Sequence, residues 1–173
     1  MDNQKKIDRF RGDFDYLSNF YMRAPFEDLC GAIWKSVEHY YQAAKTHHPT
    51  YRNNIYMCQT PGDAKFLGSR CPLRENWGRI KESVMRKALL MKFSQNLDIA
   101  KKLVSTQGFL LIEGNTWHDN FWGTCTCEKC RGVHAKRQPQ YQSGLNRLGF
   151  HLMSVRNEVI SNGELLLKIV KEV

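Results

Sequence analysis

The stretch SVEHYYQAAK, which begins at Ser36, constrains the fold more than any other part of the sequence because it specifies where a helix starts. Ser36 is a good N-cap, since its hydroxyl can accept a hydrogen bond from a free N–H of a helix that begins at Val37. Glu38 then lies in the first turn, where the helix dipole favours a negative charge. Because the residue before a proline resists the helical conformation, Pro49 limits this helix, and we expect it to end near His47.

The spacing of side chains divides this predicted helix into two faces. Offsets of three and four residues place side chains on the same face of a helix. An apolar face that suits a hydrophobic core carries Val37, Tyr40 and Ala44. The opposite face presents a carboxylate, a phenol, an amide and an amine, from Glu38, Tyr41, Gln42 and Lys45. Most polar helix faces meet water, so we expect a solvated surface here, with one wall of a functional site as the alternative.

Helical patterns dominate the remaining chain. They cover residues 61–68, 80–93, a segment that ends near 104, and a long segment that Ser143 would cap and that Asn162–Gly163 would break. Strand patterns are limited to a small hairpin between Pro25 and Trp34 and a buried strand at 109–113. Residues 1–9 are expected to form a flexible lead-in, and residues 124–142 a cysteine-rich and basic insert. The sequence therefore predicts one domain over residues 1–173 that is mainly α-helical, with a few short β-strands.

The chain is basic, with 26 Lys and Arg residues against 17 Asp and Glu residues and a formal net charge of +9. Such a field attracts polyanions or phosphorylated ligands, although a basic protein can also have no such partner. Basic residues without any acid occupy residues 129–147, namely Lys129, Arg131, Lys136, Arg137 and Arg147. No apolar run approaches the ~20 residues of a membrane helix, and the N-terminal residues do not resemble a signal peptide. We therefore expect a cytoplasmic protein without a membrane partner.

A second polar and aromatic stretch, EGNTWHDNFWG at 113–123, follows the predicted strand. Loops at strand ends often present ligand-binding groups, and aromatic faces can stack on a base or cover a sugar. Asp119 lies between Trp117 and Trp122, where it would be poorly solvated, and is a candidate acid. The alternative is that both tryptophans pack in the core. His118 is expected to form structural hydrogen bonds rather than to act in catalysis.

Three of the six cysteines, Cys125, Cys127 and Cys130, lie within six positions, and His134 follows four residues later. In a cytoplasmic chain such a cluster is more typical of metal ligands than of disulfides. Three thiolates and one imidazole would complete a closed tetrahedral zinc site. The spacing differs from the standard zinc-finger spacings, so free reduced thiols are the alternative. We expect no catalytic cofactor, and a structural zinc ion is the cofactor that the sequence suggests.

Seven short motifs, in order, make the chain resemble the NADAR family, the YbiA-like or NAD- and ADP-ribose-associated proteins. The motifs are LSNFY at 17–21, SVEHYYQAAK at 36–45, AKFLG at 64–68, Trp77 with Lys81 and Met85, KF at 92–93, EGNTWHDNFWG at 113–123, and GLNRLG with LMSVR at 144–156. The resemblance implies a mostly helical fold and an N-glycosidase that cleaves a bond between a base and ribose. Two substrate classes are known in the family: ADP-ribose on guanine bases of nucleic acid, and phosphoribosylated intermediates of riboflavin synthesis.

The chemistry of this reaction suggests catalytic residues within the motifs. Positive charge develops on the anomeric carbon of the ribose, and an acid must protonate the leaving base, so two carboxyl groups are expected. Glu38 and Asp119 are the acids in the strongest motifs. The resemblance favours a route in which a neutral lysine attacks the anomeric carbon and forms a Schiff base. Lys45 is the first choice because it shares a helix face with Glu38, its candidate base, and Lys65 and Lys81 are the runners-up.

Further residues of the motifs are candidates for binding the substrate. They are Asn19, Tyr41, Gln42, Lys65, Arg70, Trp77, Lys81 and Trp122. The two tryptophans would clamp the base or the ribose. The net charge favours ADP-ribosylated nucleic acid over a small phosphorylated ribosyl-base substrate. Two functions of other classes stay open: a non-catalytic reader of ADP-ribose or nucleic acid, and a small zinc-stabilised nucleic-acid-binding module.

Overall fold

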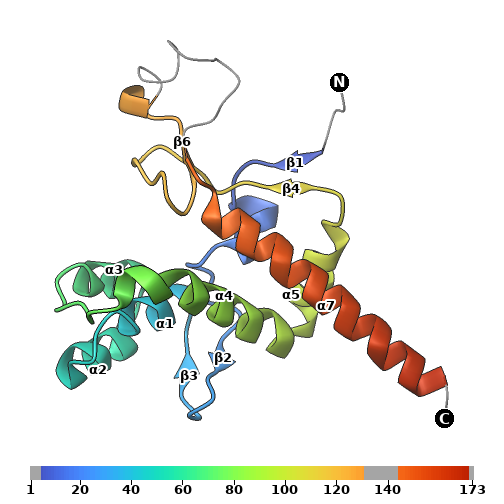
Figure 1. Ribbon diagram of the computed structural model, residues 1–173, viewed down its shortest axis with the longest axis horizontal. Helices are drawn as coiled ribbons and strands as arrows, with labels where there is room; N and C mark the ends of the chain where they lie inside the picture. The colour runs from blue at the N-terminus through green and yellow to red at the C-terminus, as the bar shows by residue number, and fades with distance from the viewer. Residues whose placement is uncertain (1–4, 131–143, 172–173) are drawn as a thin grey trace. The chain divides into compact units, whose positions relative to one another are not determined.

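A computed structural model describes residues 5–130 and 144–171, without the side chains of 164–171. The chain divides into two compact units, each described separately below. The central unit comprises Ser18–Lys102, and the terminal unit comprises Met1–Leu17 together with Leu103–Val173. Helix predominates over strand, as the sequence predicts, and every strand among the described residues is only two residues long (Figure 1).

The central unit contains a β-hairpin followed by helices. As predicted, strand β2 (Phe26–Glu27) pairs antiparallel with strand β3 (Ile33–Trp34). The helices that follow are α1 (Val37–Ala43), α2 (Pro49–Met57), α3 (Pro61–Gly68), α4 (Trp77–Gln95) and α5 (Leu97–Ser105), whose end belongs to the terminal unit. The helices predicted at 61–68 and 80–93 are therefore confirmed as α3 and α4.

The hairpin turn is organised by the side chain of Asp28. Its Oδ1 accepts hydrogen bonds from the backbone N–H groups of Cys30 and Ala32, at 2.8 and 3.1 Å. Its Oδ2 accepts one from the indole nitrogen of Trp34, at 2.8 Å. Gly31 adopts a φ of +83°, a left-handed conformation that glycine reaches without steric cost. These contacts hold Trp34 against the helix that comes next.

Helix α1 contacts α2, α3, α4 and β3 and so lies at the centre of this unit (Figure 1). Ser36 caps it as predicted, and its hydroxyl accepts a hydrogen bond from the N–H of His39 at 3.3 Å. The ring of Tyr40 makes edge contacts with Trp34 and Phe26, at centroid distances of 5.3 and 6.0 Å. Aromatic packing therefore anchors one side of α1 to the hairpin.

Two predictions for this region are wrong. Helix α1 ends at Ala43 rather than near His47, and a separate helix begins at Pro49, a residue that fits the first turn of a helix. The polar face is also buried instead of solvated, since Glu38 and Gln42 are only 5% and 3% exposed. The physical reason is that α3 and α4 pack against the short α1, so more than one of its faces lies inside the unit.

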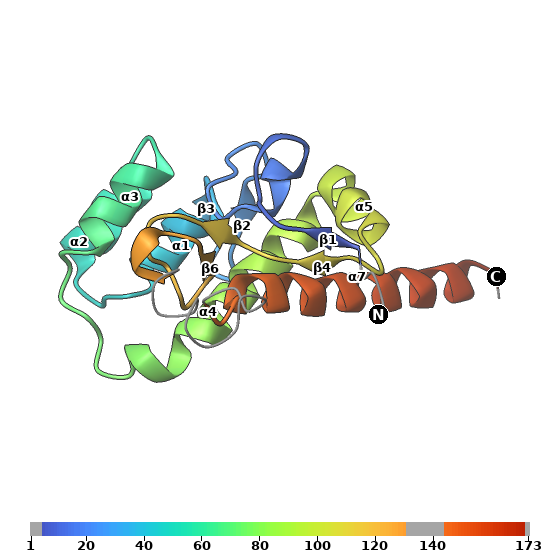
Figure 2. The ribbon, with the colours of Figure 1, turned by 90° about the horizontal axis from the view of Figure 1, so that it is seen from above.

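The terminal unit is built on two pairs of parallel strands. Strand β1 (Lys6–Ile7) pairs with β4 (Leu110–Leu111), and β5 (Gly114–Asn115) pairs with β6 (Thr124–Cys125). A 3₁₀ helix, η1 (Gly12–Leu17), follows β1. The long helix α7 (Arg147–Lys171) lies beside β4, as Figure 2 shows.

The strand pair β1–β4 both confirms and corrects the sequence-based predictions. The buried strand expected at 109–113 is present as β4. Residues 6–7, however, belong to β1 and not to a flexible lead-in. The N–H of Leu110 donates to the carbonyl of Lys5 at 2.9 Å, and the N–H of Ile112 donates to that of Ile7 at 2.8 Å. Ile7 is buried, which further fixes this segment.

Helix α7 buries Leu148, Leu152 and Val155, as the three-and-four spacing predicts. The predicted break at 162–163 is wrong, because α7 continues to Lys171. A glycine destabilises a helix interior by only about 1 kcal/mol relative to alanine. This cost is too small to end a helix whose neighbouring residues favour the helical conformation. The proposed cap, Ser143, lies outside the described residues. Within the described part of the chain, none of the helices, α7 included, combines the length and the apolar character needed to span a membrane.

Candidate active site

Glu38 is a buried carboxylate held by neighbours in the central unit. Its Oε1 accepts a hydrogen bond of 2.6 Å from Nε2 of Gln42, one turn later in α1. Its backbone N–H donates to the carbonyl of Asn19 at 3.0 Å. Burial of a charge is unfavourable unless polar groups compensate for the lost water. Burial and the hydrogen bond from Gln42 therefore restrain this carboxylate.

Two buried acceptor atoms lie in the residues that contact Glu38. The side-chain oxygens of Asn19 and Gln42, Oδ1 and Oε1, accept no hydrogen bond from any described residue. Buried polar atoms are nearly always paired in folded proteins, so an unpaired one marks a place for water or a ligand. The amide of Gln42 also touches Gly68, where an added Cβ would overlap its Oε1. These two oxygens suit the hydroxyl donors of a bound sugar.

Lys45 lies half-buried just beyond the end of α1. Its Nζ is 3.5 Å from the carbonyl oxygen of Gly68 and 5.7 Å from the ring centroid of Tyr41. Burial lowers the pKa of the Lys45 ammonium from its ordinary value. The charge of Glu38 opposes this shift, and the nearby charge of Lys65 adds to it. A larger fraction of the amine is therefore neutral and nucleophilic than in a lysine exposed to water.

Tyr41 and Trp77 form an aromatic contact between α1 and α4. Their ring centroids are 5.0 Å apart at an interplanar angle of 60°, and both side chains are buried. Lys81, a runner-up nucleophile, is half-buried one turn after Trp77 in α4. The structure thus places two predicted binding residues, Tyr41 and Trp77, in direct contact. A third, Lys81, lies one helical turn after Trp77 in α4.

Lys65 and Arg70 lie on the exposed surface of α3 and just after it. The Nζ of Lys65 is 5.8 Å from the ring centroid of Phe20, and the guanidinium of Arg70 is 3.5 Å from that of Phe66. The guanidinium also donates a hydrogen bond of 3.1 Å to the carbonyl of Phe66. These cations therefore pair with exposed aromatic rings, while Glu38 is buried beneath the surface.

Sequence reasoning missed two fully buried polar residues of the central unit. Nδ1 of His39 lies 2.7 Å from Oγ of Ser36, and burial lowers the pKa of the imidazole. Lys92 is 0% exposed and donates from Nζ to the carbonyl of Ser18 at 3.0 Å. Both residues occur within recognised motifs, SVEHYY and KF, and that was the available signal. Lys92 holds the segment that continues into Asn19.

In the terminal unit, Asp119 organises the loop between β5 and β6. Its Oδ1 accepts hydrogen bonds from the backbone N–H groups of Phe121 and Trp122, at 3.2 and 2.9 Å. The side chain of Asn115 binds the backbone N–H and the carbonyl of Asp119, at 3.1 and 2.8 Å. Trp122 is half-buried, whereas Trp117 is 50% exposed and therefore not a core residue. The convergence of Asp119 with Glu38 and Lys45 stays a prediction.

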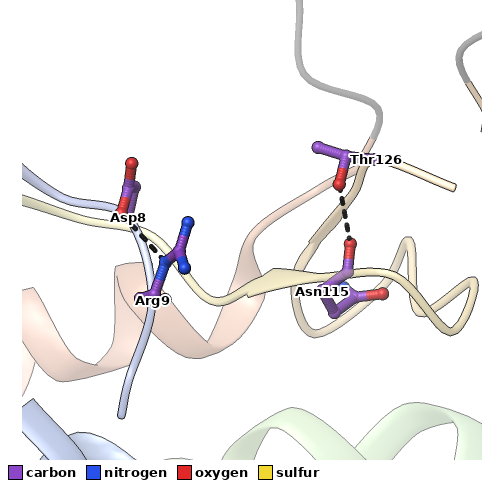
Figure 3. A network of polar contacts seen from close by, with 4 residues as sticks. All are labelled: Asp8, Arg9, Asn115 and Thr126. Atoms are coloured by element: carbon purple, nitrogen blue, oxygen red, sulfur yellow. Dashed lines mark hydrogen bonds and ion pairs between the residues drawn. The ribbon is translucent and has the colours of Figure 1, made fainter. Parts of the chain in front are cut away.

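A cavity of about 200 Å³ lies beside the β5–β6 pair within the same unit. Figure 3 shows two polar contacts at its edge. Nε of Arg9 lies 3.6 Å from Oδ1 of Asp8, and Oγ1 of Thr126 donates to the carbonyl of Asn115 at 3.4 Å. None of the residues that line this cavity was predicted to be catalytic.

The three clustered cysteines gather around His118. Sγ of Cys125, Sγ of Cys127, Sγ of Cys130 and a ring nitrogen of His118 all lie within 4.8 Å of one another. The side-chain hydrogen bond with His118 is the largest of the effects that lower the pKa of Cys127 to about 6. This His/Cys₃ cluster has the ligand types and the proximity to hold a metal ion. His134, the ligand predicted from spacing, lies outside the described residues. His118 was expected only to form structural hydrogen bonds, and the sequence did not group it with the cysteines.

Known proteins match most of this chain. The NADAR domain matches residues 8–160. N-glycosidase YbiA of Escherichia coli (strain K12) is 37% identical over 131 residues, covering 75% of this chain and 72% of YbiA. An N-glycosidase of Nostoc punctiforme is 39% identical over 132 residues, covering 73% of this chain and 74% of the relative. The chloroplastic riboflavin biosynthesis protein PYRR of Zea mays is 31% identical over 161 residues, which are 86% of this chain and 23% of PYRR.

The fold is also shared with a solved structure. The NMR structure of the E. coli protein YbiA matches with a TM-score of 0.76 at 30% sequence identity. The match covers 94% of this chain and 89% of that one. The prediction of a mainly helical, YbiA-like fold is therefore confirmed.

Proposed function

Because the chain belongs to the NADAR family, it is an N-glycosidase of the YbiA type, and we propose that it removes ADP-ribose from guanine bases of nucleic acid. The proposed reaction breaks the bond between the anomeric carbon of the ribose and a nitrogen of the base. One observation supports the chemical step above others. Burial lowers the pKa of the Lys45 amine, and the charge of the buried Glu38 acts on the same amine.

Lys45 is the proposed nucleophile. The lone pair of its neutral Nζ attacks the anomeric carbon, while the bond to the base breaks and the base leaves with a proton from an acid. Glu38 takes a proton from Nζ, the bond between the anomeric carbon and the ring oxygen then breaks, and the ring oxygen takes up that proton, which leaves a protonated Schiff base. Water adds to this Schiff base and releases the sugar, which regenerates the amine. We propose Asp119 as the acid that protonates the leaving base.

Glu38 is the proposed base of this reaction. It would accept the proton that leaves Lys45 when the carbon–nitrogen bond forms, and its position is set by Gln42. The unpaired oxygens of Asn19 and Gln42 are proposed to accept hydrogen bonds from ribose hydroxyls. Tyr41 would form one wall of the site. Stacking by the indoles at positions 77 and 122 is proposed to hold the base or the sugar.

Charge and exposed aromatic rings support a polymeric substrate. The net charge is +9, and Phe20 and Phe66 are 40% and 57% exposed with Lys65 and Arg70 over their rings. Exposed rings can stack on bases, and neighbouring cations can contact phosphates, which is the usual arrangement for binding single strands. Most of the basic segment 129–147 lies outside the described residues, so it does not enter this argument.

A second candidate substrate is a phosphoribosylated intermediate of riboflavin synthesis. The observation that favours it is the similarity to a riboflavin biosynthesis protein of Zea mays. Such a small molecule carries few phosphates and needs only one or two cations for binding. No metal is assigned to the chemical step in either case, and we propose that the His/Cys₃ cluster has a structural role.

The direct test is to incubate the protein with an oligonucleotide that carries ADP-ribosylated guanine and, separately, with a ribosylaminouracil phosphate, and to measure released sugar. Borohydride should trap a covalent adduct of the wild-type protein and none of Lys45→Met, with Lys101→Met as the control on an exposed lysine. If Lys45→Met and Glu38→Gln both keep full activity, the assignment is wrong. Binding of ADP-ribose without release from either substrate would show a non-catalytic reader.

A further inference from the structure

We propose that the terminal unit binds one structural zinc ion through Cys125, Cys127, Cys130 and His118. The spacing of the sequence points to His134 as the fourth ligand, but the geometry points to His118, which precedes the cysteines. The site lies entirely within one unit, and it does not depend on the reaction proposed above. It would join the loop between β5 and β6 to the cysteine segment that follows it.

Two of the distances between ligand atoms are close to those of a tetrahedral zinc site, and the others are short enough for small shifts to reach them. Zn–S and Zn–N bonds of about 2.3 and 2.0 Å require S–S separations of about 3.8 Å and S–N separations of about 3.5 Å. Nδ1 of His118 lies 3.2 Å from Sγ of Cys130 and 3.6 Å from Sγ of Cys127. The largest separation within the set of four atoms is at most 4.8 Å. Changes of about 1 Å or less in these separations would place all four atoms around one ion.

The pairing of β5 with β6 explains why a residue upstream of the cysteines reaches them. Asn115 lies opposite Cys125 in this parallel pair, so the two ends of the intervening loop lie close together. Within the loop, His118 adopts a φ of +67°, an uncommon conformation for a residue other than glycine. Its backbone N–H lies 3.2 Å from Sγ of Cys125. Spacing along the sequence could not reveal this closure.

Hydrogen-bond donors contact two of the three sulfurs, as expected for thiolate ligands. Sγ of Cys125 accepts from the backbone N–H groups of His118 and Cys127, at 3.2 and 3.3 Å. Sγ of Cys130 accepts from Nδ2 of Asn120 at 3.4 Å. Donors of this kind stabilise negative charge on metal-bound sulfur and orient the ligands.

The ligand set favours zinc in a closed, structural site. Three thiolates and one imidazole suit Zn²⁺ in tetrahedral geometry, and four protein ligands leave no position for a reactive water. Cys125 and Cys130 are buried and Cys127 is half-buried, which limits access of solvent to the ion. The expected role is therefore to hold the loop that contains Asp119 in one conformation.

The first experiment measures the metal in the full-length wild-type protein, purified under reducing conditions without an affinity tag of histidines. Elemental analysis should find about one zinc per chain, and replacement by Co²⁺ should give the intense visible spectrum of tetrahedral cobalt with thiolate ligands. Alkylation should modify the three clustered cysteines only after a chelator is added. A chain that takes up no zinc, with all its thiols open to alkylation, would overturn the proposal.

The second experiment decides between the two histidines. We expect His118→Asn to lower zinc affinity by more than the roughly 10–100-fold that changes around the ligands cause, because a ligand itself is lost. Asparagine tolerates the left-handed backbone at this position, so the loop conformation is preserved. The matched variant His134→Asn should bind zinc as tightly as the wild type. Loss of zinc from His134→Asn alone, or from neither variant, would refute the assignment of His118.

Cysteine variants provide a control for folding. Cys127→Ser should lose zinc, whereas Cys30→Ser, which changes an exposed cysteine of the central unit, should keep it. Circular dichroism of each variant separates loss of the site from loss of the fold. If Cys127→Ser fails to fold, the wild type still decides: a chelator should lower its melting temperature, and added zinc should restore it. No change in melting temperature on zinc removal would contradict a structural role.

Discussion

Gln42 donates a hydrogen bond of 2.6 Å from Nε2 to Oε1 of Glu38, one helical turn earlier, and both side chains are buried. The other end of the same amide, Oε1, rests against Gly68 at the end of α3 without a hydrogen-bond partner among the described residues. One side chain thus sets the position of the proposed base and offers an acceptor to the substrate.

Replacing Gln42 by methionine keeps the length of the side chain and removes its hydrogen bond to Glu38. We expect kcat/KM for sugar release to fall about 10–100-fold, in line with the roughly 1.5–3 kcal/mol of a hydrogen bond to a charged group. Gln59→Met is the matched control, because Gln59 is exposed and its amide donates to the carbonyl of Met57 at 3.3 Å. Equal kcat/KM values for Gln42→Met and wild type would show that Glu38 needs no such support.

Substitution of Gly68 by alanine should disturb the site through packing. The added Cβ would overlap the amide of Gln42, so that side chain must move away from Glu38. Overpacking of this kind typically destabilises a protein by about 1–3 kcal/mol. We expect a lower urea midpoint together with reduced kcat/KM. The control is Gly78→Ala, at a helix position with open space around it, which should instead stabilise the protein by about 0.5–1 kcal/mol. A Gly68→Ala protein that is as stable and active as the wild type would contradict the predicted overlap with Gln42.

The pH dependence of the reaction should report the state of Lys45. Burial disfavours its cationic form, so the pKa lies below the ordinary value of 10.5, and kcat/KM should rise with pH through a midpoint below that value. Lys65 contributes a positive charge that helps to lower this pKa. Lys65→Met should therefore move the midpoint to higher pH, whereas Lys101→Met, on an exposed lysine, should not move it. A midpoint unchanged in Lys65→Met would argue against Lys45 as the titrating group.

Salt should separate the two substrate classes. Cleavage of an ADP-ribosylated single strand should weaken with salt, with a slope of about −0.7 in log kcat/KM against log salt for each phosphate contact. Arg70→Met should make this slope shallower by about one contact. Reaction with the small ribosylaminouracil phosphate should depend only weakly on salt. If the oligonucleotide reaction shows no slope, the nucleic-acid substrate is the wrong proposal.

Local rules predicted the starts of elements well. Ser36 caps α1 as predicted, and α3 begins at Pro61 as predicted, since helix starts depend on residues within one turn; the cap that Thr60 supplies to α3 was not predicted. The burial of Glu38 was not predictable from its own helix, because α3 and α4 pack against α1 and this packing is not encoded in the spacing of α1. The sequence correctly grouped the polar residues of this face, but it did not predict that they are buried.

The candidate functional residues divide in the same way, into those that the sequence can group and those that only the fold brings together. Glu38, Gln42 and Lys45 could be grouped from sequence because one short segment carries all three. His118 could not be grouped with Cys125, since their proximity arises from the pairing of β5 with β6. Lys92 escaped notice for a related reason: an isolated lysine in a helix is ordinarily exposed, and only the fold shows it donating to the carbonyl of Ser18.

The short strand β1 also affects how this protein should be trimmed for expression. The family match begins at residue 8, so a version cut to that boundary would lose Lys5 and Ile7. The carbonyls of Lys5 and Ile7 accept hydrogen bonds from the backbone N–H groups of Leu110 and Ile112. Without this strand, both N–H groups would lose their acceptors along one edge of β4. Shortened versions intended for crystallisation or assays should therefore start upstream of Lys5, although the family match begins only at residue 8.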